Sequence, residues 1–405
     1  MDVAGRPLSL PDVSDADLAG LAYGVFTLSG EQRRRVGARL GPLVLDLAVL
    51  ADTDLLPDPL AAPTLDAFMA CGPLIWDETR RRIEHLVTSP NAHRRLDGAF
   101  HPVDGVTMHL PFTVADYVDF YSSLHHAVNV GRILRPDADP LPANWRHLPI
   151  GYHGRSGTVV VSGAEIPWPS GQRLEPDGTV TFGPSRRLDF ELEVGFVIGI
   201  PSRLGEPVPI ERVMEHVFGV VLVNDWSARD IQAWEYQPLG PFLGKSFATT
   251  ISAWVLPLDA VEPVRVSGPS QEPEPLPHLR RREPWGLDLD LKVKLRTARM
   301  RSDGSEPATI CETGFADQYW TVAQQLAHLT SNGASLRTGD LVASGTVSGP
   351  LPGQAGSLLE ATRGGTEPLE LPDGEERAFL EPGDEVILEG RAGAVALGAA
   401  TGIVA

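Results

Sequence analysis

Residues 224–250 read NDWSARDIQAWEYQPLGPFLGKSFATT and hold more chemically capable side chains than any other part of the chain. They follow an apolar run at residues 217–223, which predicts a buried strand of seven residues. Asp225 would then stand at the end of this strand, where a rigid sheet can hold a functional side chain. We therefore expect the fold to be built around this strand and the segment after it.

A polar stripe is predicted directly after the strand. If the chain is helical from Ser227 onward, Arg229, Gln232 and Tyr236 have the spacing i, i+3, i+7 and share one stripe. A polar stripe beside a buried strand indicates a function other than packing. The loop that follows is predicted to be irregular because of its prolines and glycines, which are Pro238, Gly240, Pro241 and Gly244. This loop presents Lys245 between apolar neighbours, which indicates an anchored cation.

The same loop is superficially similar to a phosphate-binding loop, because residues 240–246 read GPFLGKS. That motif needs about four residues between its first glycine and the Gly-Lys-Ser, and a helix after it. Only residues 241–243 intervene here, and FATTI at residues 247–251 favours a strand. Both the spacing and the context therefore argue against nucleotide binding.

Composition and charge exclude several classes of partner. Of the 405 residues, 42% are hydrophobic and 21% are charged, and the 41 glycines and 36 prolines favour turns between short strands. The net charge of -19 argues against a nucleic-acid or anionic-membrane partner, since both need a basic face. An anionic small-molecule substrate remains compatible with this net charge, because its binding depends only on the charges close to its site.

We expect neither a membrane-spanning nor a secretory segment. The longest apolar runs are far shorter than the ~20 residues that cross a bilayer, and the N-terminus lacks a basic segment followed by an apolar core. Cys71 and Cys311 are too few and too far apart for a disulfide framework, so we expect both to be reduced in the cytoplasm.

The first part of the chain predicts a small α+β domain. Residues 20–50 contain short β-like runs, and residues 64–69 and 76–87 predict helices. Without a low-complexity linker to mark the boundary, we place it near residue 110. This divides the chain into a small domain at 1–110 and a catalytic domain at 111–405.

A strict alternation of apolar and acidic residues occurs at 188–194, which read LDFELEV. On a strand, Asp189, Glu191 and Glu193 would share one face, with successive backbone positions about 6.5 to 7 Å apart. Two such acids can bend toward one hard cation, which removes their mutual repulsion. The alternative is a solvated face of an antiparallel sheet, which is common.

Paired histidines lie in a segment that predicts a helix, but the sequence leaves open where this helix begins. Ser122 or Ser123 is predicted to cap a helix that runs to about residue 134. If the helix instead begins at residue 113, Asp119 and His126 share a face because they are seven residues apart. The plain alternative for this pair is a surface carboxylate and a histidine that is satisfied within the core.

Four further blocks join residues 224–250 in one resemblance. They are DFYSSLHHAVNVG, LPIGYHGRSG, LDFELEV and ASGTVSG. With these blocks in the family's order, the chain resembles the fumarylacetoacetate hydrolase family from about residue 21 to about residue 390. The resemblance implies an α+β, mainly β fold of the fumarylacetoacetase type, with a small N-terminal barrel-like domain and a large C-terminal mixed β-roll domain. It also implies a homodimer.

The resemblance implies a metal-dependent hydrolase. Its reaction would cleave the C–C bond of 4-fumarylacetoacetate, a 1,3-diketo acid, to fumarate and acetoacetate, the final step of tyrosine and phenylalanine catabolism. The family's metal carboxylates fall on four acids, which are Asp119, Glu191, Glu193 and Asp225. An all-oxygen set suits Ca²⁺ or Mg²⁺ far better than Zn²⁺ or Cu²⁺. A second Mg²⁺ is implied near Asp225, Lys245 and Thr249, although Ala248 replaces the glycine usual there.

The resemblance also assigns the other site residues. It carries the general base over to His126, oriented by Glu360. The implied oxyanion donors are Arg229, Gln232 and Lys245. The implied substrate contacts are Tyr121, Arg135, Tyr152, Gln232, Tyr236 and Thr346. Among these, Arg135 would pair with a substrate carboxylate in a bidentate manner.

These residue types also make chemical sense together. Cleaving a C–C bond between two carbonyls with water needs a base, donors for an oxyanion, and a sink for the departing carbanion. Imidazole suits the first role because it exchanges protons near neutral pH, and each oxyanion donor is typically worth about 3 to 4 kcal/mol. A cation that holds the 1,3-dicarbonyl would supply the third.

Two other functions remain as alternatives. A related metal-dependent lyase or decarboxylase that acts on a 2-keto acid would keep the carboxylates, but it has no need of His126 and Glu360. A non-catalytic metal-binding scaffold has no use for Lys245 in an apolar loop. The sequence therefore favours the hydrolase.

Overall fold

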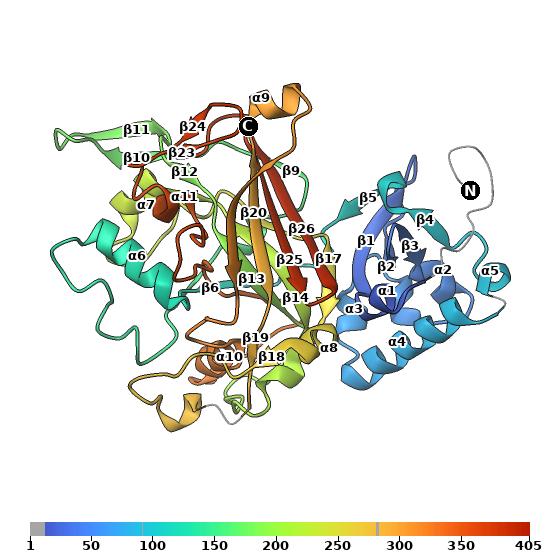
Figure 1. Ribbon diagram of the computed structural model, residues 1–405. Coiled ribbons are helices and arrows are strands. Elements are labelled where there is room, and N and C mark those ends of the chain that lie inside the picture. Colours follow the sequence, from blue (N-terminus) through green and yellow to red (C-terminus); the bar gives the residue numbers. More distant parts are fainter. Residues whose placement is uncertain (1–12, 91, 281–282) are drawn as a thin grey trace.

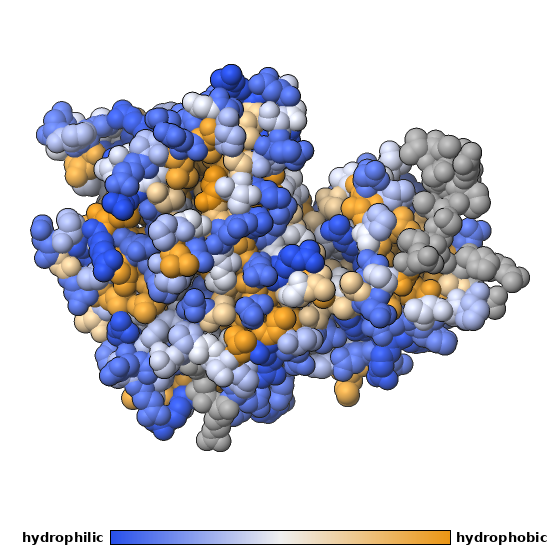
Figure 2. All heavy atoms as spheres, in the orientation of Figure 1, coloured by the Kyte–Doolittle hydropathy of each residue, from blue (hydrophilic) through white to orange (hydrophobic). Residues whose placement is uncertain are grey.

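The computed structural model describes residues 13–90, 92–280 and 283–405, so residues 1–12 of the predicted first domain lie outside it. A smaller N-terminal part, blue in Figure 1, lies beside a larger part that is built mainly from long strands. The predicted α+β class, with strands in the majority, is confirmed. Figure 2 shows a face on which hydrophilic side chains dominate and apolar ones are scattered in small groups.

The N-terminal part is a sheet with helices packed against it. Its strands are β1 (Ala22–Leu28), β2 (Arg35–Leu40), β3 (Leu43–Asp46), β4 (Phe100–Pro102) and β5 (Val106–His109). Its helices are α1 (Asp15–Ala19), α2 (Leu47–Asp52), α3 (Asp66–Met69), α4 (Pro73–Thr88) and α5 (Ala92–Arg95). Helices α3 and α4 confirm the two that the sequence predicts. β1 pairs with β2 and β5 and also with β17 (Trp254–Pro257) of the larger part, so one sheet runs through both parts. The barrel-like form and the boundary near residue 110 stay predictions.

The strand β14 (Val217–Asp225) lies at the centre of the larger part. It is buried along its whole length, which confirms the predicted strand, and it ends at Asp225. The sheet continues in the order β17-β14-β13-β22-β6-β7. These further strands are β13 (Leu192–Ile198), β22 (Leu341–Ala343), β6 (Tyr117–Phe120) and β7 (Gly151–His153). β14 also pairs with β16 (Thr249–Ile251), which pairs in turn with β8 (Val159–Val161).

A second sheet packs against the first (Figure 1). Its strands, in order, are β21 (Ala308–Gly314), β20 (Asp290–Arg296), β25 (Glu385–Ala392), β26 (Val395–Val404) and β9 (Ala164–Ile166). The two sheets approach closely where Gly402 of β26 faces Trp226, because a Cβ at Gly402 would lie only 2.6 Å from the indole ring. Trp226 is fully buried there, directly after Asp225, and fixes the end of β14 in the core.

Several local predictions are wrong. Residues 188–194 are not one strand but two, β12 (Leu188–Asp189) and β13, with a break at residues 190–191. Their acids are fully or almost fully buried, so the solvated face is also wrong. The helix near the paired histidines is α6 (Leu124–Leu134), capped by Ser123, and the alternative start at residue 113 is excluded because β6 occupies that region. The helix after β14 begins only at α7 (Arg229–Glu235), since residues 227–228 form β15 (Ser227–Ala228) opposite β12.

The remaining elements are short. The strands are β10 (Ser170–Leu174), β11 (Val180–Pro184), β18 (Arg265–Val266), β19 (Gly286–Leu287), β23 (Leu369–Glu370) and β24 (Glu376–Arg377). The helices are α8 (Leu258–Val261), α9 (Ala298–Ser302), α10 (Val322–Thr330) and α11 (Leu358–Ala361). Within the described residues, none of the helices combines the length and the apolar character that crossing a membrane requires.

Candidate active site

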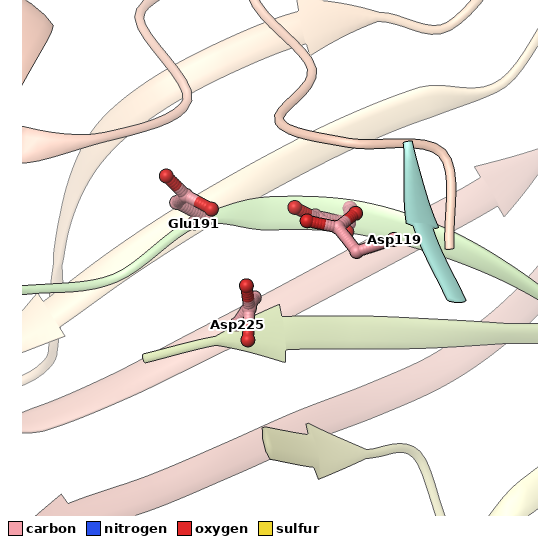
Figure 3. Close-up of side chains that lie close together, drawn as sticks. Asp119, Glu191 and Asp225 are labelled. Atoms are coloured by element: carbon pink, nitrogen blue, oxygen red, sulfur yellow. The ribbon is translucent and has the colours of Figure 1, made fainter. Parts of the chain in front are cut away.

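Four buried carboxylates meet where neighbouring strands come together (Figure 3). Asp119 lies on β6, Glu193 on β13, Glu191 directly before β13, and Asp225 at the end of β14. One carboxylate oxygen of each lies within 4.8 Å of those of the other three. In Figure 3 the labelled side chains of Asp119, Glu191 and Asp225 point toward one another from three different segments. The four acids are therefore close enough to share one cation.

Strand pairing brings these distant parts of the sequence together. β22 lies between β6 and β13, with Ala343 opposite Asp119 on one side and opposite Gly195 on the other. β13 pairs with β14, so that Leu192 lies opposite Asn224. These registers bring the three acid-bearing strands to one end of the sheet, where each contributes a side chain to the same point.

Part of this cluster lacks hydrogen-bond partners. Among the described residues, Oδ1 of Asp119 and both carboxylate oxygens of Glu193 have no hydrogen-bond partner. Burial and the charge of Asp225 raise the pKa of Asp119 well above its ordinary value, and burial and Asp119 do the same to the pKa of Glu193. Buried carboxylates without partners are costly, whereas a hard divalent cation binds such oxygens directly. The residues present therefore fit Ca²⁺ or Mg²⁺.

Lys245 balances the other side of the cluster. Its ammonium contacts the carboxylates of Glu191 and Asp225, with 2.7 Å between Nζ and Oδ2 of Asp225. Burial opposes the charge on Lys245, but these two acids raise its pKa above the ordinary value. Burial also opposes the charge on Glu191, yet Lys245 and Arg229 lower its pKa to about 2. The side chain of Lys245 is therefore a counter-charge to these two acids, and a charged ammonium has no free lone pair with which to bind a metal ion.

Asp225 is held in place by Tyr152, Thr249 and Lys245 beside a cavity. The Tyr152 hydroxyl donates to Oδ2 at 2.9 Å, and the Thr249 hydroxyl donates to Oδ1 at 3.1 Å. Tyr152, Asp225, Lys245 and Thr249 line a cavity of about 390 Å³ whose outer wall includes Phe242. The structure thus brings together all the residues predicted for a second Mg²⁺, and the second ion itself stays a prediction.

Arg229 connects the cluster to α7. Its Nη1 lies 2.7 Å from Oε1 of Glu191, while Nε and Nη2 each lie 2.8 Å from Oδ2 of Asp189. Nη1 also donates to Oε1 of Gln232 at 3.3 Å. Burial opposes the charge of the guanidinium, but the two acids raise its pKa above the ordinary value. Arg229 is therefore a permanent cation whose position is set by two carboxylates.

His126 and Glu360 form a buried pair at the start of α6. Ser123 accepts a hydrogen bond from the backbone N–H of His126 and begins the helix. Nδ1 of His126 lies 2.6 Å from Oε2 of Glu360. Asn129, one turn further along α6, donates to Oε1 of Glu360 at 3.1 Å. Burial opposes ionisation of Glu360, but His126 and these hydrogen bonds hold its pKa below the ordinary value.

Comparison with known proteins places this arrangement in a family. Residues 19–111 match the family model described as fumarylacetoacetase N-terminal, and residues 116–403 match the one described as fumarylacetoacetate hydrolase C-terminal. The chain is 48% identical over 390 residues to fumarylacetoacetase of Homo sapiens, covering 93% of this chain and 92% of the relative. It belongs to the fumarylacetoacetase family.

Other members and structures agree with this placement. The fumarylacetoacetase of Arabidopsis thaliana is 42% identical over 387 residues, covering 92% of this chain and 90% of the relative. Among solved structures, a fumarylacetoacetate hydrolase from Exiguobacterium antarcticum has a TM-score of 0.55 at 16% identity, covering 95% of this chain and 99% of the other. A maleylpyruvate hydrolase from Sphingobium has a TM-score of 0.53 at 15% identity, covering 95% and 99%. At such identities the likeness shows the fold alone.

In this member of the fumarylacetoacetase family, two predicted substrate contacts lie at the ends of α6. The ring of Tyr121 meets that of His126 edge-on, with centroids 5.4 Å apart, and its hydroxyl lies 3.4 Å from the carbonyl oxygen of Ala127. Arg135 follows the last residue of α6 and donates from Nη2 to the carbonyl oxygen of Pro140 at 2.8 Å. Arg135 is half-buried, and its charge acts on Tyr121, so both lie on the His126 side of the site.

Two further predicted contacts, Tyr236 and Thr346, differ in exposure. Tyr236 follows α7 and is half-buried, and its hydroxyl accepts a hydrogen bond from Gln237 at 3.1 Å. Thr346 is 2% exposed and lies in the turn after β22. Its neighbour Gly345 has a φ of +77°, and a Cβ there would lie 2.0 Å from the carbonyl oxygen of Phe120. Only glycine allows this turn to lie so close to β6.

Sequence reasoning missed three residues that orient this family member's site. Asp189 holds Arg229, Asn129 holds Glu360, and Asn224 accepts a hydrogen bond from the backbone N–H of Glu191 at 3.1 Å. Asn129 had a usable signal, since it follows His126 by three residues and shares its helix face. For Asp189 and Asn224 the only signal in the sequence was that each lies near a predicted metal ligand.

Proposed function

We propose that this protein hydrolyses the C–C bond of 4-fumarylacetoacetate to fumarate and acetoacetate, as the last step of tyrosine and phenylalanine breakdown. One observation supports this more than any other. A buried histidine and carboxylate, with Nδ1 of His126 2.6 Å from Glu360, lie in the same site as four converging carboxylates. Such a site can activate water and hold a dicarbonyl at once. Identity of 48% to human fumarylacetoacetase over 93% of the chain supports the choice of substrate.

In this proposal His126 is the general base. Its Nδ1 is engaged with Glu360, which leaves Nε2 for a water molecule. Nε2 takes a proton as the water oxygen attacks a substrate carbonyl carbon. When the C–C bond breaks, its electron pair leaves with the acetoacetate fragment, and the proton on Nε2 passes to that carbanion. Glu360 keeps the imidazole oriented and stabilises its charged form.

The oxyanion that forms after attack needs donors, and two of the three predicted side chains, Lys245 and Gln232, have hydrogens free to supply them. An ammonium has three hydrogens, and Lys245 directs two at Glu191 and Asp225, which leaves one for the substrate. Gln232 accepts from Arg229 through Oε1, so its amide N–H groups are free to donate. Each such donor typically contributes about 3 to 4 kcal/mol to transition-state stability.

The residues proposed to hold a divalent cation are Asp119, Glu191, Glu193 and Asp225. When bound, Ca²⁺ or Mg²⁺ would supply positive charge for a 1,3-dicarbonyl as its negative charge grows. The chain's own part is to keep Glu193 and Asp119 free for the ion, and to balance the remaining charge through Lys245. A second Mg²⁺ beside Asp225 and Thr249 belongs to the same proposal.

We propose that the substrate lies between Arg135 on the His126 side and Tyr236 and Tyr152 on the α7 side. Arg135 would pair with a terminal carboxylate, since a guanidinium matches a carboxylate in a bidentate manner. Thr346, in the turn after β22, would fix the position of the carbon chain of the substrate. We also propose a homodimer in the cytoplasm, divided into domains near residue 110. The free thiols of Cys71 and Cys311 support a reducing compartment.

A direct assay tests the function. Purified protein is freed of metal with a chelator, and the loss of fumarylacetoacetate absorbance is followed before and after Mg²⁺ or Ca²⁺ is added. We expect no turnover without metal and recovery with either ion. Failure to consume fumarylacetoacetate under all conditions would remove the proposal.

The second candidate is a metal-dependent lyase or decarboxylase that acts on a 2-keto acid. It would need the four carboxylates but not the His126–Glu360 pair. Product analysis separates the two, because hydrolysis yields two acids from one diketo acid and consumes one water.

A further inference from the structure

We propose that Asp189 is a positioning residue that fixes the base and the oxyanion donor of the site relative to each other. This rests on the proposed hydrolase function. Asp189 does not belong to the carboxylate cluster, because both of its oxygens are turned toward protein donors. One set of donors belongs to Arg229, and the other belongs to the backbone of α11, which carries Glu360.

The contact with Arg229 sets the direction of the guanidinium. Oδ2 of Asp189 lies 2.8 Å from both Nε and Nη2, which leaves Nη1 to reach Glu191 and Gln232. Asp189 is 0% exposed, so water does not compete for this pair. An arginine held along one edge by a carboxylate presents its other edge in a single orientation.

The contact with α11 sets the position of Glu360. The backbone N–H of Leu358 donates to Oδ1 of Asp189 at 2.7 Å, and that of Leu359 donates to Oδ2 at 3.0 Å. These are the two residues directly before Glu360, in a helix of only four residues. Such a short helix cannot hold its own orientation, so an outside anchor is needed. The anchor and Ser357, which donates to Oε2 of Glu360 at 2.9 Å, together aim Glu360 at His126.

A carboxylate is the group that this position requires. Asp189 accepts from the N–H groups of Phe190, Leu358 and Leu359 and from Arg229, and it has no donor to offer in return. An asparagine amide has one accepting oxygen, and its NH₂ group would face donors on the other side. Asp189→Asn keeps the size of the side chain but breaks one set of contacts, so either the guanidinium or α11 must move.

The chain contains a matched buried pair away from the site. Asp384 is also 0% exposed, and its oxygens lie 2.9 and 3.1 Å from Nε and Nη2 of Arg377. It also accepts from the backbone N–H of Glu381 at 2.9 Å. Asp384→Asn therefore carries a similar cost to the fold without touching the base or the donor.

The first test compares turnover and Michaelis constants in the metal-loaded enzyme. We expect Asp189→Asn to lower kcat about a hundredfold, as a misplacement of about 1 Å does, with little change in KM. Asp384→Asn should lose a similar amount of thermal stability and keep its kcat. Equal kcat losses in the two variants would mean that Asp189 is merely structural, and the proposal would fail.

The second test asks whether Asp189 acts through Glu360. In a Glu360→Gln background the base is already misplaced, so adding Asp189→Asn should lower kcat by much less than it does in the wild type. If the two losses multiply fully, Asp189 does not act through Glu360 and the proposal is overturned.

A third readout needs no substrate and separates this proposal from the proposed function. The proton between His126 and Glu360 should give a low-field NMR signal that disappears in His126→Gln. We expect Asp189→Asn to move this signal and Asp384→Asn to leave it in place. An unmoved signal would refute the positioning role even if the enzyme hydrolyses fumarylacetoacetate. A moved signal with no hydrolysis in the wild type would support the positioning role and refute the substrate.

Discussion

His126 and Glu360 lie 234 positions apart in the sequence, and Nδ1 of the imidazole is 2.6 Å from Oε2 of the carboxylate. The carboxylate is anchored from several sides, by Asn129 at Oε1 and by the hydroxyls of Ser348 and Ser357 at Oε2. Because Glu360 cannot turn away, the imidazole is held with one nitrogen engaged and the other available. A general base needs this arrangement.

Replacement of His126 by alanine should separate catalysis from metal binding. We expect turnover to fall about a hundredfold or more, the usual scale for a positioned base, while the affinity for Mg²⁺ or Ca²⁺ measured by calorimetry stays near normal. His125→Ala is the control, because this neighbour is half-buried and lines a different, smaller cavity. Normal turnover in His126→Ala would exclude His126 from the mechanism.

Glu360→Gln should change how stability depends on pH. A carboxyl with a lowered pKa in the folded state adds stability that is fully present above its ordinary pKa of about 4.3 and is lost as pH falls through the lower folded value. We therefore expect the variant to be less stable than the wild type by about 1 to 3 kcal/mol at pH 7, with the difference shrinking below about pH 4. Urea unfolding at several pH values measures this. A difference that grows in acid would contradict the assignment.

Glu193→Gln should lose the cation and gain stability in its absence. Both oxygens of Glu193 lack partners, and neighbouring acids repel its charge. We expect the metal-free variant to unfold at a higher temperature than the metal-free wild type. Its affinity for Ca²⁺ or Mg²⁺ should fall by more than about tenfold, a loss that even indirect metal contacts can cause. Glu389→Gln, which removes a half-exposed acid paired with Lys294, should do neither.

Lys245→Met should make the fold more dependent on metal. Without the ammonium, Asp225 loses its ion-pair partner and Glu191 keeps only Arg229, and breaking such a buried pair costs about 3 to 5 kcal/mol. We expect the metal-free variant to be destabilised and the gain in melting temperature on adding Ca²⁺ to exceed that of the wild type. A gain no larger than that of the wild type would argue against Lys245 as a counter-charge. Lys292→Met, on the exposed face of β20, is the control.

Sequence patterns predicted those helices and strands that are determined by residues close together in the sequence. A continuous apolar run predicted β14, and a cap at Ser122 or Ser123 predicted the start of α6, because burial and capping act within a few residues. The alternation at residues 188–194 was misleading. It predicted one strand, but the carboxylate of Asp189 bonds to its own neighbour Phe190 and to α11, and the strand breaks there.

The sequence predicted which residues form the site better than it predicted how they are arranged. Family resemblance named the four acids, His126 and Glu360, and the structure gathers the four acids at one point and pairs His126 with Glu360. The part played by Asp189 could not be predicted, since its partners Arg229 and Leu358 are distant in sequence and one is a backbone group. No local sequence pattern records a contact between a side chain and a backbone N–H that is distant in sequence.

The position of β22 has a consequence for how the protein matures. This short strand, residues 341–343, separates β6 from β13, so the position of Asp119 relative to Glu193 is set only when the last third of the chain has been made and folded. A nascent or truncated polypeptide that stops before residue 341 would own all four acids and still be unable to gather them. Assembly of the complete carboxylate cluster therefore depends on a strand from the last third of the chain.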